Sequence, residues 1–401
     1  MPATPSEIAI FDFSPENLMI RRYDNDTLKY FTDEPQPRWA KCRWISVNGL
    51  SWDVIQVIAR EYRLDRLGVQ YMLDTRSRTK AEMFPNHSLL ILTLQKLVFM
   101  SSDEDDQSSQ GSETLSSSQV QRALQWLRAL LSWKRRPDNG PDIEKGEYSR
   151  TLQGYYTGSH DPRTVLLEKY SPLKREFVVL CEQVSIFIID SNVVISFFEN
   201  SAQDIEPQII ERIVTPGTVL RESCDASVLA QAIIGSVVDL AIPVEAAYRD
   251  VIGDLELDVL TGPTLEDTKS LYLVVSEISR LLNFITPIVP LVNNLRDHHS
   301  TTVNKKSAGS EQVPPTKQKE SMYIASIVDR CISLTASLNQ LNSSANAMIE
   351  LIFNTLAAYQ NRTMKQLTVA TIIFLPLTFI TAYFGQEFQP FDDLELGISH
   401  L

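Results

Sequence analysis

The C-terminal part of the sequence contains one long apolar run, which constrains the architecture more than any other feature. Residues 366–386 carry no formal charge, and Leu367–Phe384 consists mainly of apolar residues and threonines. At about 1.5 Å per residue, a helix over Leu367–Phe384 is roughly 27 Å long, close to the hydrocarbon thickness of a bilayer. We therefore expect a transmembrane helix over residues 366–384, and we expect no other membrane span in the sequence.

A repeating pattern leads directly into this run. From residue 321 to 384 there is no glycine, and the only proline is Pro376. Apolar and small residues follow one another at alternating spacings of four and three, which predicts that one face of a long helix packs against partner helices. The stripe consists of Ile327, Cys331, Leu334, Leu338, Leu341, Ala345, Met348, Ile352, Thr355 and Tyr359. Ser321–Phe384 would then be one helix on the order of 95 Å long.

Charge excludes some classes of protein and orients the chain. The net charge of -13, with no basic face, argues against binding to nucleic acid. The N-terminus lacks the apolar region of a signal peptide. Arg362 and Lys365 precede the apolar run, whereas only acidic charged residues follow it. This bias predicts that the bulk of the chain lies on the cytosolic side, and we favour the plasma membrane over an organelle membrane.

Residues 1–205 are predicted to form a mixed α/β domain. Helices are expected over Trp52–Tyr62 and Asp65–Leu73, and Asp190-Ser191-Asn192 is typical of a hairpin turn. Predicted strands cover Glu7–Phe11, Arg43–Val47, Leu89–Phe99, Arg163–Glu168, Phe177–Leu180, Val184–Ile189 and Val193–Phe198. A Ser-rich, acidic insertion near residues 101–118 is predicted to be disordered, and Val120–Trp133 is a further helix candidate.

Residues 206–365 are predicted to be helical, with the stalk helix from about residue 321. Helices are expected over Ser227–Ala241 and Val244–Leu260, separated at Pro243. Another helix is expected over Leu265–Leu282 and on to Leu295, and Asp297–Glu320 should be a loop. The fold class is therefore α+β: a mixed α/β domain, a helical region, and a very long C-terminal helix that continues into a membrane. Residues 385–401 would form a short acidic tail.

Familiar catalytic and metal-binding motifs are not found. The sequence has no P-loop, no GxGxxG after a strand, no GxSxG and no HExxH, so we do not expect an enzyme. The four cysteines form no CxxC pair and are expected to be reduced core residues. His298-His299 fall in a polar loop and are more typical of a surface than of a metal site.

The end of the long helix resembles the CorA-type magnesium transporter superfamily. The resemblance rests on Asn361-Arg-Thr-Met364-Lys-Gln-Leu367-Thr368, on Phe374-Leu-Pro376-Leu-Thr378, and on Tyr383-Phe384-Gly385-Gln386-Glu387-Phe388. The hairpin Val184–Phe198 and the segment Asp239–Leu260 are also similar to the cytosolic domain of that family. The resemblance extends from about residue 165 to 388.

The resemblance implies a membrane-embedded homopentamer that conducts divalent cations, magnesium first, without a cofactor. The pore-facing residues would be Met364, Leu367, Leu375 and Thr378, and the selectivity entrance would be Gly385, Gln386 and Glu387. Rings of oxygen ligands can select a hydrated divalent cation, with Glu387 as the first candidate metal ligand. Asp254 and Glu256 are further candidates for sensing the ion, although a solvated or capping role suits them equally.

Two departures from the family pattern leave a second reading open. Gln386-Glu387 stand where the family has Met-Asn, and residues 385–401 are too short and too charged to provide the family's second span. The alternative is therefore a non-conducting, tail-anchored interaction or regulatory protein, which pairs through its heptad stripe with full-length relatives or with other helices. A soluble enzyme is a distant third.

Overall fold

The structure is a computed structural model that describes residues 5–28, 35–99, 150–157, 161–171, 177–190, 192–296 and 315–385. The chain divides into two compact units. The first unit comprises Met1–Lys169, Leu173–Val244 and Asn283–Ser333. The second comprises Tyr170–Pro172, Glu245–Leu282 and Leu334–Leu401.

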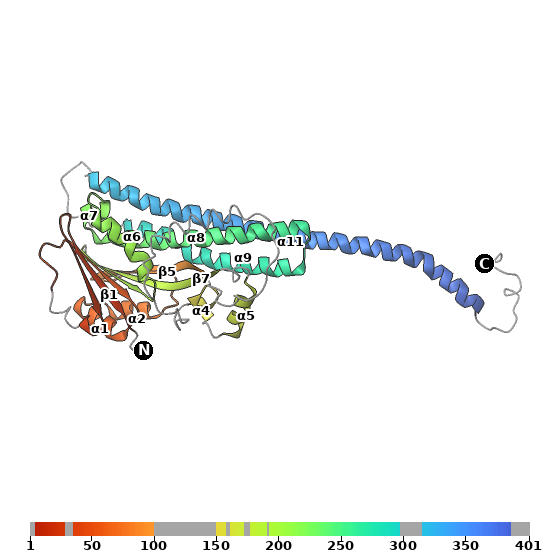
Figure 1. Cartoon of the computed structure of the whole chain (residues 1–401), viewed down its shortest axis with the longest axis horizontal. Helices are drawn as coiled ribbons and strands as arrows, with labels where there is room; N and C mark the ends of the chain where they lie inside the picture. Colours follow the sequence, from red (N-terminus) through yellow and green to blue (C-terminus); the bar gives the residue numbers. More distant parts are fainter. Residues whose placement is uncertain are drawn as a thin grey trace, which may run out of the picture. The chain divides into compact units, whose positions relative to one another are not determined.

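The first unit contains an eight-stranded mixed sheet (Figure 1). Its strand order is β2-β1-β3-β8-β7-β5-β4, with β6 also paired to β7. Strands β3 and β8 are parallel, whereas the other described neighbours are antiparallel. The strands are β1 (Glu7–Phe13), β2 (Leu18–Asp24), β3 (Cys42–Asn48), β4 (Lys80–Met83), β5 (His87–Phe99), β6 (Arg150–Thr151), β7 (Phe177–Ile189) and β8 (Val193–Phe198).

The predicted fold class is confirmed, and most predicted strands are present. β1, β3, β5 and β8 contain the four strands that the sequence predicted at these positions. The hairpin at Asp190 is also confirmed, because β7 and β8 run antiparallel with Ile189 opposite Val193. Asp190 has a φ of 50°, a left-handed conformation that aspartate tolerates better than most residues.

Two strand predictions were wrong in detail. The predicted strands Phe177–Leu180 and Val184–Ile189 are one strand, β7, which runs through Glu182 and Gln183. Both polar side chains are buried in the sheet, where they make hydrogen bonds. The segment Arg163–Glu168 is part of helix α5 (Pro162–Tyr170) instead of a strand. Its start is set by the Asp161 side chain, which accepts a hydrogen bond from the Arg163 amide, and by proline at the first helical position.

Helices cover both faces of the sheet. On one face, α1 (Trp52–Glu61) and α2 (Arg66–Leu73) pack their buried residues against β1, β3 and β8. Asp65 caps α2 by accepting a hydrogen bond from the Leu67 amide at 2.8 Å. On the other face, α6 (Ala202–Val214) contacts β3 and buries Ile205, Ile209 and Ile213 (Figure 1). This unit also contains the short helices α4 (Gly154–Thr157) and α7 (Val219–Ser223).

Helix α8 (Ala226–Thr261) is continuous through Pro243, so the predicted break at this proline was wrong. A proline removes one backbone hydrogen bond from a helix, but packing on either side can hold the helix together. Ala241 and Val244 are both buried. Helix α9 (Leu265–Ile285) is followed, after a short turn, by helical residues 288–296.

Helix α11 (Pro315–Gly385) is one continuous helix, as the sequence predicted, and appears in blue in Figure 1. It begins at Pro315, so the last residues of the predicted loop Asp297–Glu320 are helical instead. The predicted stripe is buried from Ile327 to Ile352, each member at most 8% exposed. Thr355 is half-buried and Tyr359 is 58% exposed, so the buried part of the stripe ends at Ile352.

Several predicted features lie outside the described residues. They are the acidic insertion 101–118, the helix candidate Val120–Trp133, His298-His299, the entrance residues Gln386 and Glu387, and the tail that follows them.

Candidate pore helix and buried polar network

The last third of α11 is an apolar helix that no other described part of the chain covers. An 18-residue window within Met322–Gly385 has a mean hydropathy of 2.0, and none of it is buried. Large apolar side chains in this part of the helix are exposed; examples are Leu367 (68%), Ile372 (67%) and Leu375 (65%). A continuous apolar surface of this size requires a lipid or protein covering, because water solvates it poorly.

Two other helices are also long and apolar enough to cross a membrane by length and composition, so the sequence-based expectation of a single candidate was too narrow. They are α8 and the helical region Leu265–Arg296. In these two, 72% and 44% of the most apolar window is buried inside the protein. The protein's own packing therefore covers most of the apolar window of α8 and somewhat less than half of that of Leu265–Arg296, whereas it covers none of that of α11.

Hydroxyl groups in the apolar part of α11 are bonded to the helix itself. Thr371 and Thr378 donate to the carbonyl oxygens of Leu367 and Phe374 at 2.8 and 2.7 Å. Such bonds satisfy the hydroxyl in an apolar medium and leave its oxygen able to accept. Pro376 lacks the amide hydrogen that would bond to Ile372, so one carbonyl is free for a water or a neighbouring group.

The four residues predicted to face a pore lie on one side of α11. At about 100° per residue, Met364, Leu367, Leu375 and Thr378 fall within a sector of roughly 80°. The centre of this sector is rotated by roughly 100° from the buried residue Ile352. The predicted pore side is therefore different from the side that packs against this chain.

The remaining predicted site residues are not brought together. Gly385 is exposed at the end of α11, and its two predicted partners in the entrance follow beyond the described residues. Asp254 and Glu256 are both exposed on α8 and, two residues apart, point in different directions. Within the described part of the chain, no group of three or more His, Cys, Asp or Glu side chains is suited to hold a metal ion.

In the second unit, polar contacts connect α8 to α11. The buried Glu245 carboxylate accepts hydrogen bonds from Ser337 of α11 and, at 2.6 Å, from Arg249. Arg249 also donates to the Ser337 hydroxyl at 3.0 Å. On α8, burial and the nearby Asp254 raise the pKa of Asp250. These contacts hold the part of α11 that precedes the exposed apolar segment.

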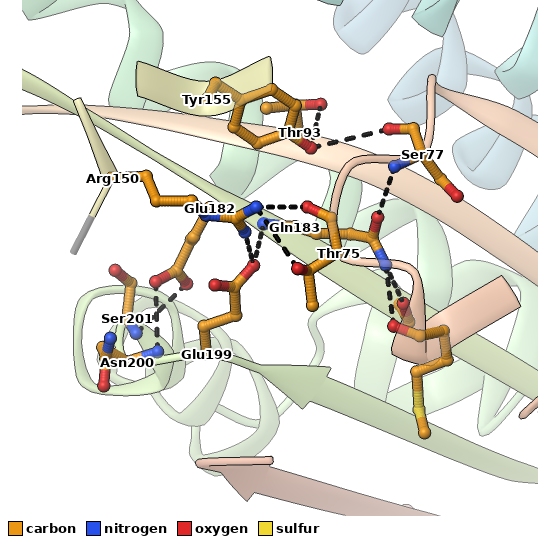
Figure 2. A network of polar contacts seen from close by, with 12 residues as sticks. Thr75, Ser77, Thr93, Arg150, Tyr155, Glu182, Gln183, Glu199, Asn200 and Ser201 are labelled. Atoms are coloured by element: carbon orange, nitrogen blue, oxygen red, sulfur yellow. Dashed lines mark hydrogen bonds and ion pairs between the residues drawn. The ribbon is translucent and has the colours of Figure 1, made fainter. Parts of the chain in front are cut away.

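In the first unit, a network of largely buried polar groups lies beside the middle of β7 and the end of β8 (Figure 2). Arg150 on β6 forms an ion pair with Glu199, which follows β8, and donates to the Thr75 carbonyl oxygen at 2.5 Å. The Glu199 carboxylate also accepts from the Gln183 amide at 2.8 Å. Gln183 in turn donates through its side chain to the Met72 carbonyl oxygen at 3.0 Å.

Glu182 on β7 is the most deeply placed acid of this network. Its carboxylate accepts hydrogen bonds from the backbone amides of Asn200 and Ser201, both at 3.1 Å, just before α6 begins (Figure 2). Burial, and after it the negative charge of Glu199, raise the pKa of Glu182 to about 7. Burial also raises the pKa of Glu199, against the effect of Arg150.

The sequence analysis did not predict this network, although one feature of the sequence indicates it. Glu182-Gln183 interrupt an otherwise apolar strand, and the prediction placed a strand break there. Buried polar pairs of this kind persist only when their hydrogen bonds are made, so their position in a strand indicates a structural or functional constraint. Arg150 and Glu199 are far apart in sequence, and no local pattern connects them.

Comparisons with known proteins identify the family. The profile of the CorA-like Mg²⁺ transporter protein family matches residues 167–398. The cobalt/magnesium transport protein CorA of Thermotoga maritima is 25% identical over 232 residues, which are 57% of this chain and 61% of that protein. The complete structure of the CorA magnesium transporter from Methanocaldococcus jannaschii is similar in fold, with a TM-score of 0.56 at 12% identity, covering 98% of this chain and 90% of that one. This chain belongs to the CorA-like Mg²⁺ transporter family.

Proposed function

We propose that this protein is a subunit of a membrane channel that conducts divalent metal cations, magnesium first, down their electrochemical gradient. The observation that carries the proposal is α11. The helix is packed into its own chain as far as Ile352 and then presents a fully exposed apolar segment long enough to cross a bilayer. Membership of a transporter family supports a function for this segment beyond anchoring.

The proposed pore is lined by the side of α11 that carries Met364, Leu367, Leu375 and Thr378. Met and Leu rings narrower than a hydrated ion would form a hydrophobic gate, and threonine oxygens would contact the hydration shell of the passing ion. Magnesium gives up its water reluctantly, so selection through the hydration shell suits it better than full coordination by protein groups. No nucleotide or cofactor takes part in this mechanism.

A pore of this kind requires several copies of α11 around one axis. A homo-oligomer, with a pentamer as the specific proposal, would cover part of the exposed apolar surface with other subunits and the rest with lipid. A hetero-oligomer with longer relatives would satisfy the same requirement. We place the bulk of the chain on the cytosolic side of the plasma membrane, with residues 1–205 and 206–365 as cytosolic domains, residues 366–384 in the bilayer and 385–401 beyond it.

The proposed selectivity entrance is Gly385, Gln386 and Glu387. A ring of Glu387 carboxylates would concentrate divalent cations at the mouth of the pore and would bind them more tightly than neutral amides. Asp254 and Glu256, exposed on α8, are proposed to respond to the cytosolic ion concentration separately, since their side chains diverge.

One sequence feature favours a second candidate, a non-conducting regulatory subunit. The replacement of Met-Asn by Gln386-Glu387 changes a neutral entrance into a charged one, and tight binding there would oppose ion release. This candidate shares the fold and the membrane helix, and differs only in whether ions pass.

The test is divalent-ion flux into liposomes that contain the purified, oligomeric protein. We expect magnesium entry from the wild type and a clear reduction with Glu387→Ala, whereas Asp392→Ala, a matched change in the same tail, should leave the flux unchanged. Absence of flux from a correctly assembled oligomer would refute conduction and favour the regulatory candidate. Equal flux from all three proteins would remove Glu387 from the entrance.

A further inference from the structure

A small pocket lies beside Glu182, and the two cations that line it are each paired with a carboxylate outside the lining. It is lined in part by Glu182, Lys96, Arg150 and Ser201, and has room for about one water molecule. Lys96 pairs with Asp204 of α6 at 2.8 Å, and Arg150 pairs with Glu199. With Glu182, three carboxylates therefore face two cations, and one added proton balances the charges.

The Glu182 carboxyl is positioned to bind that proton. It is 7% exposed, and both of its hydrogen bonds come from backbone amides instead of a cation. The Ser201 hydroxyl, itself fully buried, faces the same carboxyl, although it makes no hydrogen bond of ordinary geometry within the described part of the chain. A protonated carboxyl gains an O–H donor, and a hydroxyl oxygen is a suitable acceptor for it.

We propose that Glu182 is a proton-binding switch that controls how tightly the start of α6 is held. When Glu182 is neutral, the buried site is balanced in charge and the turn Glu199–Ser201 is closed over it. When Glu182 is ionised, its charge faces that of Glu199 in a poorly solvated site, and the turn opens to admit water.

The physical direction of the switch follows from burial. The closed site raises the pKa of Glu182 to about 7, so it binds a proton more readily than an open, hydrated site does. Among the other titratable groups around it, burial raises the pKa of Tyr155 well above neutral and also raises the pKa of Glu199, against the effect of Arg150. Acidification should therefore close the turn, and a rise in pH should loosen it.

Helix α6 connects this switch to α11 within the first unit. At the far end of α6, Arg212 donates a hydrogen bond to the Tyr323 hydroxyl of α11, and its guanidinium lies 5.5 Å from the centre of the Tyr323 ring. If the first turn of α6 is held less tightly, the change therefore affects a helix that is hydrogen-bonded to α11. This inference does not depend on ion conduction.

Hydrogen exchange of the full-length, detergent-solubilised protein tests the switch without any transport measurement. After correction for the intrinsic exchange rate, protection of the amides of residues 200–204 should fall about tenfold between pH 6 and pH 8. Glu182→Gln, a neutral side chain of the same shape, should abolish this fall. Glu211→Gln, the same change at an exposed position of α6, should leave it as in the wild type.

Glu199→Gln provides a second, independent variant. It removes the neighbouring negative charge and frees Arg150, so the midpoint of the protection change should move to lower pH. The proposal is overturned if the wild type shows no change in protection at residues 200–204, or if Glu182→Gln retains the change. It is equally overturned if Glu199→Gln, correctly folded, leaves the midpoint where it was.

Discussion

Arg330 on α11 forms a hydrogen-bonded ion pair with Asp239 on α8, inside the first unit of the chain. Both side chains are partly shielded, at 29% and 24% exposed. The pair lies beside Gly235, one turn earlier on α8, where a Cβ atom would come within 3.2 Å of Arg330 Nη2. Together these contacts fix where α11 lies along α8.

We expect the Asp239–Arg330 pair to contribute a coupling energy of about 0.5–1 kcal/mol, since partly exposed ion pairs are worth little more. A double-mutant cycle with Asp239→Asn and Arg330→Gln, measured by thermal unfolding, gives this value directly. A coupling energy indistinguishable from zero would show that the pair does not hold the two helices together.

Gly235 and Gly253 provide a matched comparison on the same helix. Any side chain at Gly235 meets Arg330 and Ile327, whereas a Cβ atom at Gly253 meets nothing within 4 Å. Gly235→Val should therefore destabilise the protein by about 1–3 kcal/mol through overpacking. Gly253→Ala should stabilise it by about 0.5–1 kcal/mol through helix propensity. A change in the free energy of unfolding of the same sign for both substitutions would contradict the close approach of α8 and α11 at Gly235.

We expect the buried His87 to lower the free energy of unfolding at acidic pH. It is 5% exposed between Phe84 and Phe187, with ring centroids 4.8 and 5.6 Å away, and neither ring nitrogen has a hydrogen-bond partner among the residues that the structure describes. Burial lowers the pKa of His87, because the charged ring is poorly solvated there. Its favourable effect is complete above the ordinary histidine pKa of about 6.5 and is lost as the pH falls through it toward the lowered value.

Thermal unfolding between pH 7 and pH 5 measures this effect. The wild type should lose up to about 1.4 kcal/mol per pH unit from this one group, and His87→Phe should lose less over the same range. Glu182 acts with the opposite sign: its raised pKa gives stability that is fully present below about 4.5 and is lost as the pH rises through about 7. An unchanged acid slope in His87→Phe would show that another group is responsible.

Much of the architecture was accessible from the sequence because it is encoded by local patterns. The 3.5-residue repeat predicted both the continuity of α11 and the residues that it buries, from Ile327 to Ile352. The α+β class followed from alternating and helical hydrophobic patterns, and the resemblance at the end of α11 led to the correct family.

The errors arise where packing overrides local preference. Pro243 does not break α8, because its neighbours are buried on a long helix. Glu182 and Gln183 do not break β7, because hydrogen bonds with the turn before α6 and with the Met72 carbonyl at the end of α2 compensate for their polarity. At α5, the Asp161-Pro162 start of a helix was present in the sequence and was overlooked in favour of the apolar residues that follow.

If one side of α11 faces the pore, alanine substitutions at two neighbouring apolar residues should have different effects on magnesium flux. Leu375 lies in the proposed pore sector, whereas Ile373 lies roughly 160° away around the helix. Leu375→Ala should widen the hydrophobic constriction and raise the resting magnesium flux into liposomes several-fold. Ile373→Ala, which shortens a side chain on the lipid or packing side, should leave it unchanged. Equal effects would place the constriction elsewhere.

The water accessibility of α11 in the assembled protein tests the pore most directly. The four native cysteines are all buried, so a cysteine introduced into the exposed segment can be labelled selectively by a charged, membrane-impermeant thiol reagent. Thr378→Cys should react readily in the assembled, bilayer-embedded protein and should be protected by magnesium, whereas Ile373→Cys should remain unlabelled. Labelling of Ile373→Cys with no labelling of Thr378→Cys would contradict a pore lined by this side of α11.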